Sequence, residues 1–242
     1  MRIKTALALT ALSVLCAIAP AEAATFVYKD SIGQQTPKIN VNNRVGKYTN
    51  ITAKFDDETN ILDWSSTFTR NSADRLADGA WLVLSDGENP KENVNEYAIL
   101  YLDSTANKVS IYNYDGKNGP SSYLQNDYLG STALNVVKNG NDEVTFEFSL
   151  DATAINSQTG KYGSEWDGIA FGKEIGIWFH SVDELETTYD SSHKLLAFNY
   201  KRRGYYDTKM AVDTKKVPEP GSLAALGIFG AVAATKLRKQ IG

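Results

Sequence analysis

The chain has 242 residues, and 25 Lys and Arg against 29 Asp and Glu give it a net charge of −4. This acidic balance argues against nucleic acid and anionic lipid surfaces as partners. The sequence contains no P-loop, G-x-G-x-x-G, H-E-x-x-H or G-x-S-x-G motif, so nucleotide binding, zinc proteolysis and α/β-hydrolase chemistry have no motif to support them.

Residues 1–23 have the three parts of a secretory signal peptide. Arg2 and Lys4 supply the positive end, an apolar run follows, and Ala21-Glu22-Ala23 is a cleavage site of the A-x-A type. The only cysteine, Cys16, lies inside this segment, so the mature chain has no disulfide and no thiol chemistry. A lipoprotein signal would acylate Cys16, but the bulky Leu15 before it favours ordinary cleavage.

The first half of the body predicts strands separated by turns. Alternating apolar residues predict a half-buried hairpin from Thr49–Phe55 and Leu62–Phe68. Ala80–Leu84 and Tyr97–Leu102 are continuous apolar runs, as in strands that are buried on both faces. In the next strand, Lys108–Tyr114, Val109 and Ile111 point to one face, and Tyr112 and Tyr114 point to the other.

The second half continues the pattern. Leu134–Val137 and Val144–Leu150 flank an Asn-Gly pair, which is a strong hairpin signal. One helical turn is expected around Ala152–Asn156. The remaining strands are expected at Ile169–Phe171, Ile175–Phe179 and Leu195–Tyr200. About ten short strands without a long helix predict an all-β fold, a two-sheet antiparallel β-sandwich or jelly roll spanning residues 24–204.

Residues 205–216 are polar and without a pattern, and we interpret them as a linker. The signal carries two basic and one acidic residue, and residues 217–242 carry three basic and one acidic. The 20 basic and 27 acidic residues between them therefore give the body a charge of −7, which is typical of a solvated acidic surface.

The C-terminal segment 217–242 begins with Pro218, Glu219 and Pro220, continues with a short apolar run, and ends with Lys and Arg residues. This order resembles the PEP-CTERM sorting signal, which a membrane enzyme called exosortase recognises. The apolar run of twelve residues reaches roughly 18 Å, short of a hydrocarbon core of roughly 30 Å, so it predicts a transient membrane anchor. The alternative is a C-terminal helix packed in the core.

Parts of the body are also similar to uncharacterised PEP-CTERM proteins. The similar blocks are Asp78–Gly87 (DGAWLVLSDG), Glu96–Tyr101, Tyr112–Tyr123 and Gly172–His180 (GKEIGIWFH). The resemblance implies secretion, sorting to the cell surface, outer membrane or extracellular matrix, and a concanavalin- or laminin-G-like sandwich. It implies no particular reaction.

Sugar binding is the first chemistry that the residue types allow. Sugar C–H faces pack on aromatic rings, while carboxylates and amides bind the hydroxyl groups. The candidate glycan-binding residues are Tyr112, Tyr114, Asn118, Tyr123 and Trp166. Tyr112 and Tyr114 share a face and could form a platform, but the pattern favours the other interpretation, in which this face is core with the tyrosine hydroxyls at its edge. Trp166 lies in a polar loop and is the best candidate for exposure, whereas Trp64, Trp81 and Trp178 lie in apolar, core-like patterns.

Calcium is the second possibility, because sandwiches of the implied class often hold a structural calcium in their loops. The weak candidate ligands are Asp56 and Asp57 in one loop and Asp86 and Glu88 in another. Neither loop has the spacing of an EF-hand, and acidic turns are common in β-proteins. We otherwise expect no cofactor.

Catalysis is the third possibility, and the sequence supports it least. Glycosidases use two carboxylates at a set separation, and Glu147 is a lone acid on its strand. The only two histidines, His180 and His193, have no recognisable partners, which favours hydrogen-bonded histidines at strand ends over a zinc site or a triad. We therefore expect a non-catalytic surface or matrix protein that binds extracellular polysaccharide. The alternatives are a purely structural coat component and, less favoured, a glycoside hydrolase or lyase.

Overall fold

The structure, a computed structural model, describes residues 24–32, 39–87, 90–92, 96–117 and 119–218. The predicted signal peptide and residues 219–242 of the predicted sorting signal lie outside these residues, as do the candidate site residues Glu88 and Asn118. Within the part of the chain that is described, no helix has the length and apolar character needed to span a bilayer.

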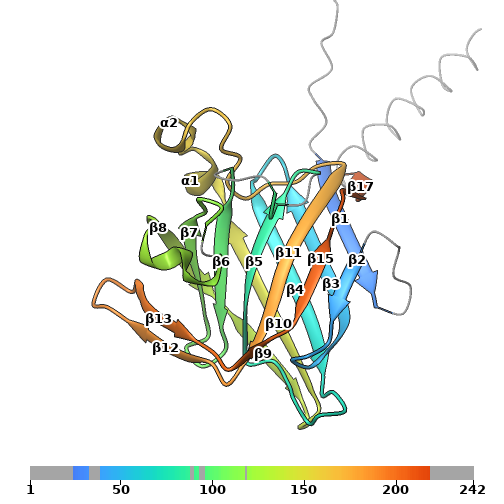
Figure 1. Cartoon of the computed structure of the whole chain (residues 1–242). Coiled ribbons are helices and arrows are strands. Elements are labelled where there is room, and N and C mark those ends of the chain that lie inside the picture. The colour runs from blue at the N-terminus through green and yellow to red at the C-terminus, as the bar shows by residue number, and fades with distance from the viewer. Residues whose placement is uncertain (1–23, 33–38, 88–89, 93–95, 118, 219–242) are drawn as a thin grey trace, which may run out of the picture.

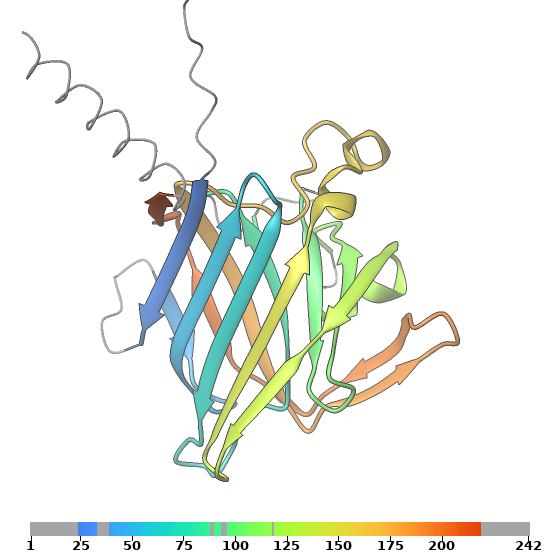
Figure 2. The ribbon, with the colours of Figure 1, turned by 180° about the vertical axis from the view of Figure 1, so that it is seen from behind.

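Two antiparallel sheets pack face to face, with sheet B nearer the viewer in Figure 1 and sheet A nearer in Figure 2. Sheet A contains, in spatial order, β17 (Lys215–Pro218), β1 (Ala24–Ser31), β3 (Lys47–Asp56), β4 (Ile61–Thr69), β10 (Glu143–Asp151) and β9 (Asn135–Asn139). Sheet B contains β2 (Ile39–Asn42), β15 (Tyr205–Thr208), β11 (Glu174–Asp183), β5 (Gly79–Ser85), β6 (Ala98–Asp103), β7 (Lys108–Asn113) and β8 (Tyr128–Ala133), and β14 (Arg202–Arg203) and β16 (Val212–Asp213) also pair with β11. The predicted antiparallel β-sandwich is confirmed.

The smaller elements lie outside these two layers. Strands β12 (Glu186–Tyr189) and β13 (Leu195–Asn199) form a separate hairpin, which projects from the body beside β6 and β7 (Figure 1). The short helices are η1 (Gly119–Leu124), α1 (Thr153–Asn156) and α2 (Thr159–Tyr162). The helical turn expected near residues 152–156 is confirmed by α1.

The core between the sheets follows from strict alternation along the strands. In β4, Leu62, Trp64, Ser66 and Phe68 are buried, while the residues that alternate with them are partly exposed. Trp64 meets Phe179 of sheet B edge-on, with ring centroids 5.1 Å apart. Burying such a side chain contributes about 1.5–3 kcal/mol. The sandwich is therefore held chiefly by aromatic and aliphatic side chains from the two inner faces.

Both predicted hairpins are present, and their turns have the expected chemistry. Strands β3 and β4 pair in antiparallel register around the turn at residues 57–60, and β9 pairs with β10. Gly140 in the second turn has φ +65°, a conformation that glycine adopts without steric cost. The prediction of buried indoles is confirmed for Trp64, Trp81 and Trp178.

Two predictions about the C-terminal half were wrong. Ile169–Phe171 form no strand; only Gly168, just before them, makes an isolated bridge to Tyr97. Residues 205–216 are not a linker, because β15, β16 and the first half of β17 lie within them. Strand β17 pairs with β1 at the edge of sheet A, so Pro218 lies opposite Ala24.

Candidate functional site

The tyrosines expected to form a glycan platform are buried. Tyr112, Tyr114 and Tyr123 are 1%, 2% and 9% exposed. They lie in a second aromatic cluster, on the outer face of sheet B, which the β12–β13 hairpin and η1 cover. Of the two interpretations that the sequence allowed for this face, the structure shows the core-like one.

Two of these tyrosines hold the hairpin in place. The Tyr112 hydroxyl accepts the Leu195 N–H at 2.7 Å, and the Tyr123 hydroxyl accepts the Phe198 N–H at 3.0 Å. Both N–H groups belong to β13. These hydroxyls therefore serve as anchors for the hairpin, and their rings present no open face to a sugar.

The expectation that Trp166 is exposed was wrong. Its indole is 1% exposed, packs 4.8 Å from the Tyr162 ring, and donates its N–H to the Tyr97 carbonyl at 3.2 Å. The neighbours Glu165 and Asp167 stay exposed. The polar residues around Trp166 therefore form the surface of the loop, whereas the Trp166 indole is buried beneath it.

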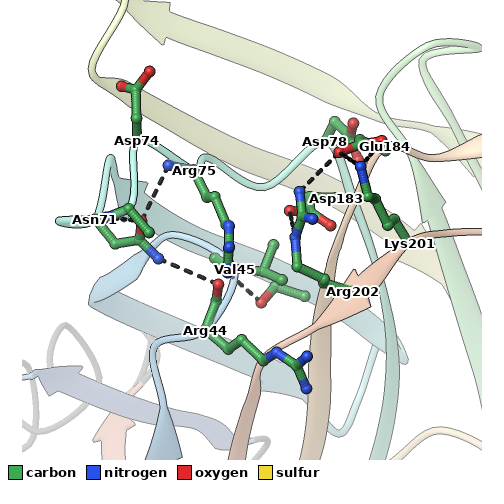
Figure 3. A network of polar contacts seen from close by, with 12 residues as sticks. Arg44, Val45, Asn71, Asp74, Arg75, Asp78, Asp183, Glu184, Lys201 and Arg202 are labelled. Carbon is green, nitrogen blue, oxygen red and sulfur yellow. Dashed lines mark hydrogen bonds and ion pairs between the residues drawn. The ribbon is translucent and has the colours of Figure 1, made fainter.

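Charged residues fix the neck of the β12–β13 hairpin, as Figure 3 shows. Arg202 donates to Asp183 at 2.8 Å, and Lys201 pairs with Glu184 at 2.9 Å. Asp78 accepts the Leu185 N–H at 3.2 Å. The hairpin is therefore attached to sheet B at its base as well as along β13.

The calcium candidates that the structure describes are engaged in hydrogen bonds within the chain. Asp56 accepts from the backbone and side chain of Thr59, Asp57 accepts the Ala24 N–H at 2.7 Å, and Asp86 accepts the Gly172 N–H at 2.7 Å. Among the residues that the structure describes, no three His, Cys, Asp or Glu side chains are grouped so that they could hold a metal ion.

Towards β15, the same aromatic cluster on the outer face of sheet B meets polar side chains through Trp81 and Trp178. In the register of the sheet, His180 lies opposite Trp81, Trp178 lies opposite Asp207, and Tyr205 neighbours His180 on β15. We name Trp81, Trp178, His180, Tyr205 and Asp207 the His180 cluster. Strand alternation places all five on the outer face, because Phe179 and Tyr206 between them point into the core.

Aromatic rings surround the imidazole of His180. The Trp81 ring stacks on it at 3.9 Å with an interplanar angle of 10°, and Trp178 meets it edge-on at 5.5 Å. Tyr205, which is only half-buried, approaches it at 5.8 Å. Asn40 of β2 donates to the Tyr205 hydroxyl at 3.4 Å. The cluster thus combines aromatic faces with amide, hydroxyl, imidazole and carboxyl groups.

The polar atoms at the centre of the His180 cluster lack hydrogen bonds. In the described part of the chain, Trp81 Nε1, both ring nitrogens of His180, and Asp207 Oδ1 have no partner. His180 Nε2 and Asp207 Oδ1 are 3.7 Å apart, too far for a direct bond. These atoms are fully buried, and buried polar groups are normally paired, so the cluster leaves an unusual amount of hydrogen-bonding capacity unused. The prediction that His180 is a hydrogen-bonded residue at a strand end was wrong, since it lies within β11.

Burial sets the protonation states in this cluster. It lowers the pKa of His180 to about 3, helped by the positive charges of Arg203 and Lys91, so the imidazole is neutral at ordinary pH. Burial raises the pKa of Asp207 from 3.8 to about 7, although Lys91, Lys209 and Arg203 oppose the shift. The side chains of His180 and Asp207 remain 9% and 12% exposed, so the cluster reaches the surface.

Asp207→Asn is expected to change the pH dependence of folding. Because the folded state raises the pKa of Asp207, its favourable contribution is complete below about pH 3.8 and is lost as the pH rises through 7. Asparagine resembles the protonated acid at every pH. The variant should match the wild type near pH 4 and exceed it by about 4 kcal/mol at pH 8, measured by urea unfolding at each pH. Equal stabilities across this range would contradict the raised pKa.

A groove on the outer face of sheet A is the main alternative site. Its volume is about 690 Å³, and its lining includes Thr52, Asp63, Ser65, Asn135 and Glu147. However, Glu147 already accepts from Asn135 at 3.0 Å and from Ser65 at 3.5 Å, and Asp63 pairs with Lys54. The polar groups of this groove satisfy one another, whereas those of the His180 cluster do not. We therefore take the His180 cluster as the candidate site.

Comparison with known proteins gives no further guidance: no family model, curated protein or solved structure matches the chain.

Proposed function

We propose that this is a secreted surface or matrix protein that binds extracellular polysaccharide at the His180 cluster without cleaving it. The observation that carries the binding proposal is the partly exposed ring of Tyr205, at the surface of a cluster whose buried polar atoms on Trp81, His180 and Asp207 are unpaired. Sugar recognition needs both elements: rings for the C–H faces, and polar groups for the hydroxyls.

The proposal also includes the cellular location of the protein. The signal-like residues 1–23 and the PEP-CTERM-like residues 217–242 support export across the inner membrane and handling by an exosortase-type enzyme, with transient membrane contact through the apolar run. The pairing of β17 with β1 puts the start of the sorting segment beside Ala24, at one edge of the sandwich. The His180 cluster is on the other sheet, so β17, in which the sorting segment begins, and the candidate site belong to different sheets.

The test is retention on exopolysaccharide from the producing cells. The protein purified from those cells is incubated with the polymer, and bound protein and released sugar are measured together. We expect retention without release. Release of reducing ends or unsaturated sugars would make the protein an enzyme and direct attention to Asp63 and Glu147 in the sheet A groove.

A structural coat component is the second candidate. Val137 on edge strand β9 and Leu196 on the hairpin are 46% and 55% exposed, and unprotected strand edges favour association between copies. This candidate predicts self-association without glycan affinity. Sedimentation of the purified protein, run beside the retention assay, separates the two.

A further inference from the structure

Ala24, the first residue that the structure describes, is also the first residue after the predicted cleavage site Ala21-Glu22-Ala23. It begins β1, and its side chain belongs to the core between the sheets. Its N–H donates to Asp57 Oδ1 at 2.7 Å, and its carbonyl accepts the Asp57 N–H at 3.1 Å. Both backbone polar groups of the residue expected to begin the mature chain are therefore bonded to Asp57.

We propose that signal cleavage after Ala23 creates an ion pair between the α-ammonium group of Ala24 and the carboxylate of Asp57, and that this pair holds the start of β1 in sheet A. The inference rests on the export step of the proposed function and does not depend on the polysaccharide. Hydrolysis consumes one water: Ala23 leaves with the new carboxylate, and the Ala24 nitrogen becomes an amine, which is protonated at neutral pH.

The atom that cleavage changes is the atom that already faces Asp57. In the uncleaved chain the Ala24 nitrogen is an uncharged amide. In the mature chain it carries a positive charge at the same position, 2.7 Å from the carboxylate oxygen, which is a typical length for an N⁺–H···O⁻ bond. Coulomb attraction is then added to the hydrogen bond, moderated by solvent because Asp57 is exposed. The turn at residues 57–60 contains Asp57 and Glu58 and no basic residue, so no like charge opposes the pair there.

The proposed ion pair lies where β1 meets two other strands. On one side, the β1–β3 ladder begins with Thr25 opposite Asp56, directly beside Ala24 and Asp57. On the other side, Ala24 lies opposite Pro218 of β17, and β17 pairs with β1 at the edge of sheet A (Figure 1). Loosening the start of β1 would therefore loosen β17 as well. The ion pair thus couples removal of the signal peptide to the placement of the segment that resembles a sorting signal.

The experiment compares two N-termini, each with and without the charge of Asp57. The full mature chain is released from a cleavable N-terminal fusion so that it begins either at Ala24 or at Ala23, and each form is also made with Asp57→Asn. Asparagine keeps an oxygen that accepts the hydrogen bond and removes only the charge. Urea unfolding gives the equilibrium constant for unfolding of all four proteins.

We expect Asp57→Asn to raise the unfolding constant about fivefold in the chain that begins at Ala24. In the chain that begins at Ala23 the rise should be at most about twofold, because the ammonium group is one residue further from Asp57. Equal effects of Asp57→Asn in the two chains would overturn the ion pair.

Glu58→Gln is the matched control, because Glu58 is an exposed acid of the same turn. It should change the unfolding constant by the same small factor in both chains. Amide exchange of β17 should quicken in Asp57→Asn of the chain that begins at Ala24 and not in Glu58→Gln. Unchanged exchange in β17 would overturn the coupling to the sorting segment.

The failures of the two proposals are distinguishable. N-terminal sequencing of the protein secreted by the producing cells is expected to begin with Ala24, Thr25 and Phe26. Another first residue would overturn this inference and leave polysaccharide binding standing. A protein that begins at Ala24 and shows the Asp57 effect, but is not retained on the polysaccharide, would overturn the binding proposal and support this inference.

Discussion

Tyr205→Ala is expected to weaken retention on the native polysaccharide roughly 30-fold, equivalent to about 2 kcal/mol. Tyr205 is the half-buried ring of the His180 cluster, so it offers the aromatic surface that a sugar can reach. Aromatic residues at the centre of a binding surface commonly carry a loss of this size when truncated. Retention measured over a series of polymer concentrations gives the change in affinity.

Tyr162→Ala is the matched control for this variant. Tyr162 is also half-buried, lies on α2, and packs against Trp166, away from the His180 cluster. The Tyr162→Ala variant loses the same side-chain atoms as Tyr205→Ala, but from another surface, so its retention on the polysaccharide should be unchanged. Urea unfolding of both variants checks that each is folded. Unchanged retention by folded Tyr205→Ala would remove the aromatic half of the proposed site.

The longer strands could be predicted because the apolar residues in each of them follow a recognisable pattern. Alternation in β3, β4 and β10 identified the faces that pack together, and the continuous apolar run of β5 identified a strand covered on both sides. The second covering layer of β5 is not another sheet. It is the aromatic cluster beneath η1 and the β12–β13 hairpin, a long-range arrangement that no local pattern specifies.

The short strands could not be predicted in the same way. Strands β15 and β17 have four residues each and β16 has two, too few to show a period. Their partners are β11, β2 and β1, of which β2 and β1 lie more than 150 residues earlier in the chain. Pairing with these distant strands, rather than local propensity, determines their conformation.

The candidate site could not be predicted either, because it too depends on contacts between residues that are distant in the sequence. The sequence favoured sugar-binding residue types, and it placed Tyr112 on the correct face of its strand, but the hairpin that buries Tyr112 comes more than 70 residues later. Asp207 and Tyr205 lay in the stretch interpreted as a linker, and His180 was set aside because no partner could be identified. The alternation of Tyr205, Tyr206 and Asp207 would have indicated which side chains face outward only if β11 had been known as the neighbouring strand.

The largest loss of stability is expected for Asp103→Ala, which removes the main polar anchor of the hairpin. Asp103 is fully buried at the end of β6. One of its oxygens accepts from the Thr105 and Ala106 N–H groups at 2.8 and 3.0 Å. The other accepts from Thr187 and Tyr189 of β12 at 2.5 and 2.9 Å. One carboxylate thus closes the β6–β7 turn and holds the hairpin against sheet B.

Replacing it with alanine should lower the free energy of unfolding by about 3 kcal/mol, because hydrogen bonds to a buried charge are lost and donors are left unpaired. The hairpin should respond first, since its donors can recover hydrogen bonds by moving into water. Amide hydrogen exchange in β12 and β13 should therefore quicken more than exchange in β4 or β10. Uniform acceleration across both sheets would contradict a local anchoring role.

Asp63→Ala provides the comparison for this variant. Asp63 is an exposed strand carboxylate that pairs with Lys54 at 3.5 Å, and exposed pairs contribute at most about 1 kcal/mol. Its loss should leave hairpin exchange unchanged. If Asp103→Ala were no more destabilising than Asp63→Ala, the hairpin would be held by Tyr112, Tyr123 and the charged neck alone. The aromatic face beneath it would then be much easier to open than the buried carboxylate implies.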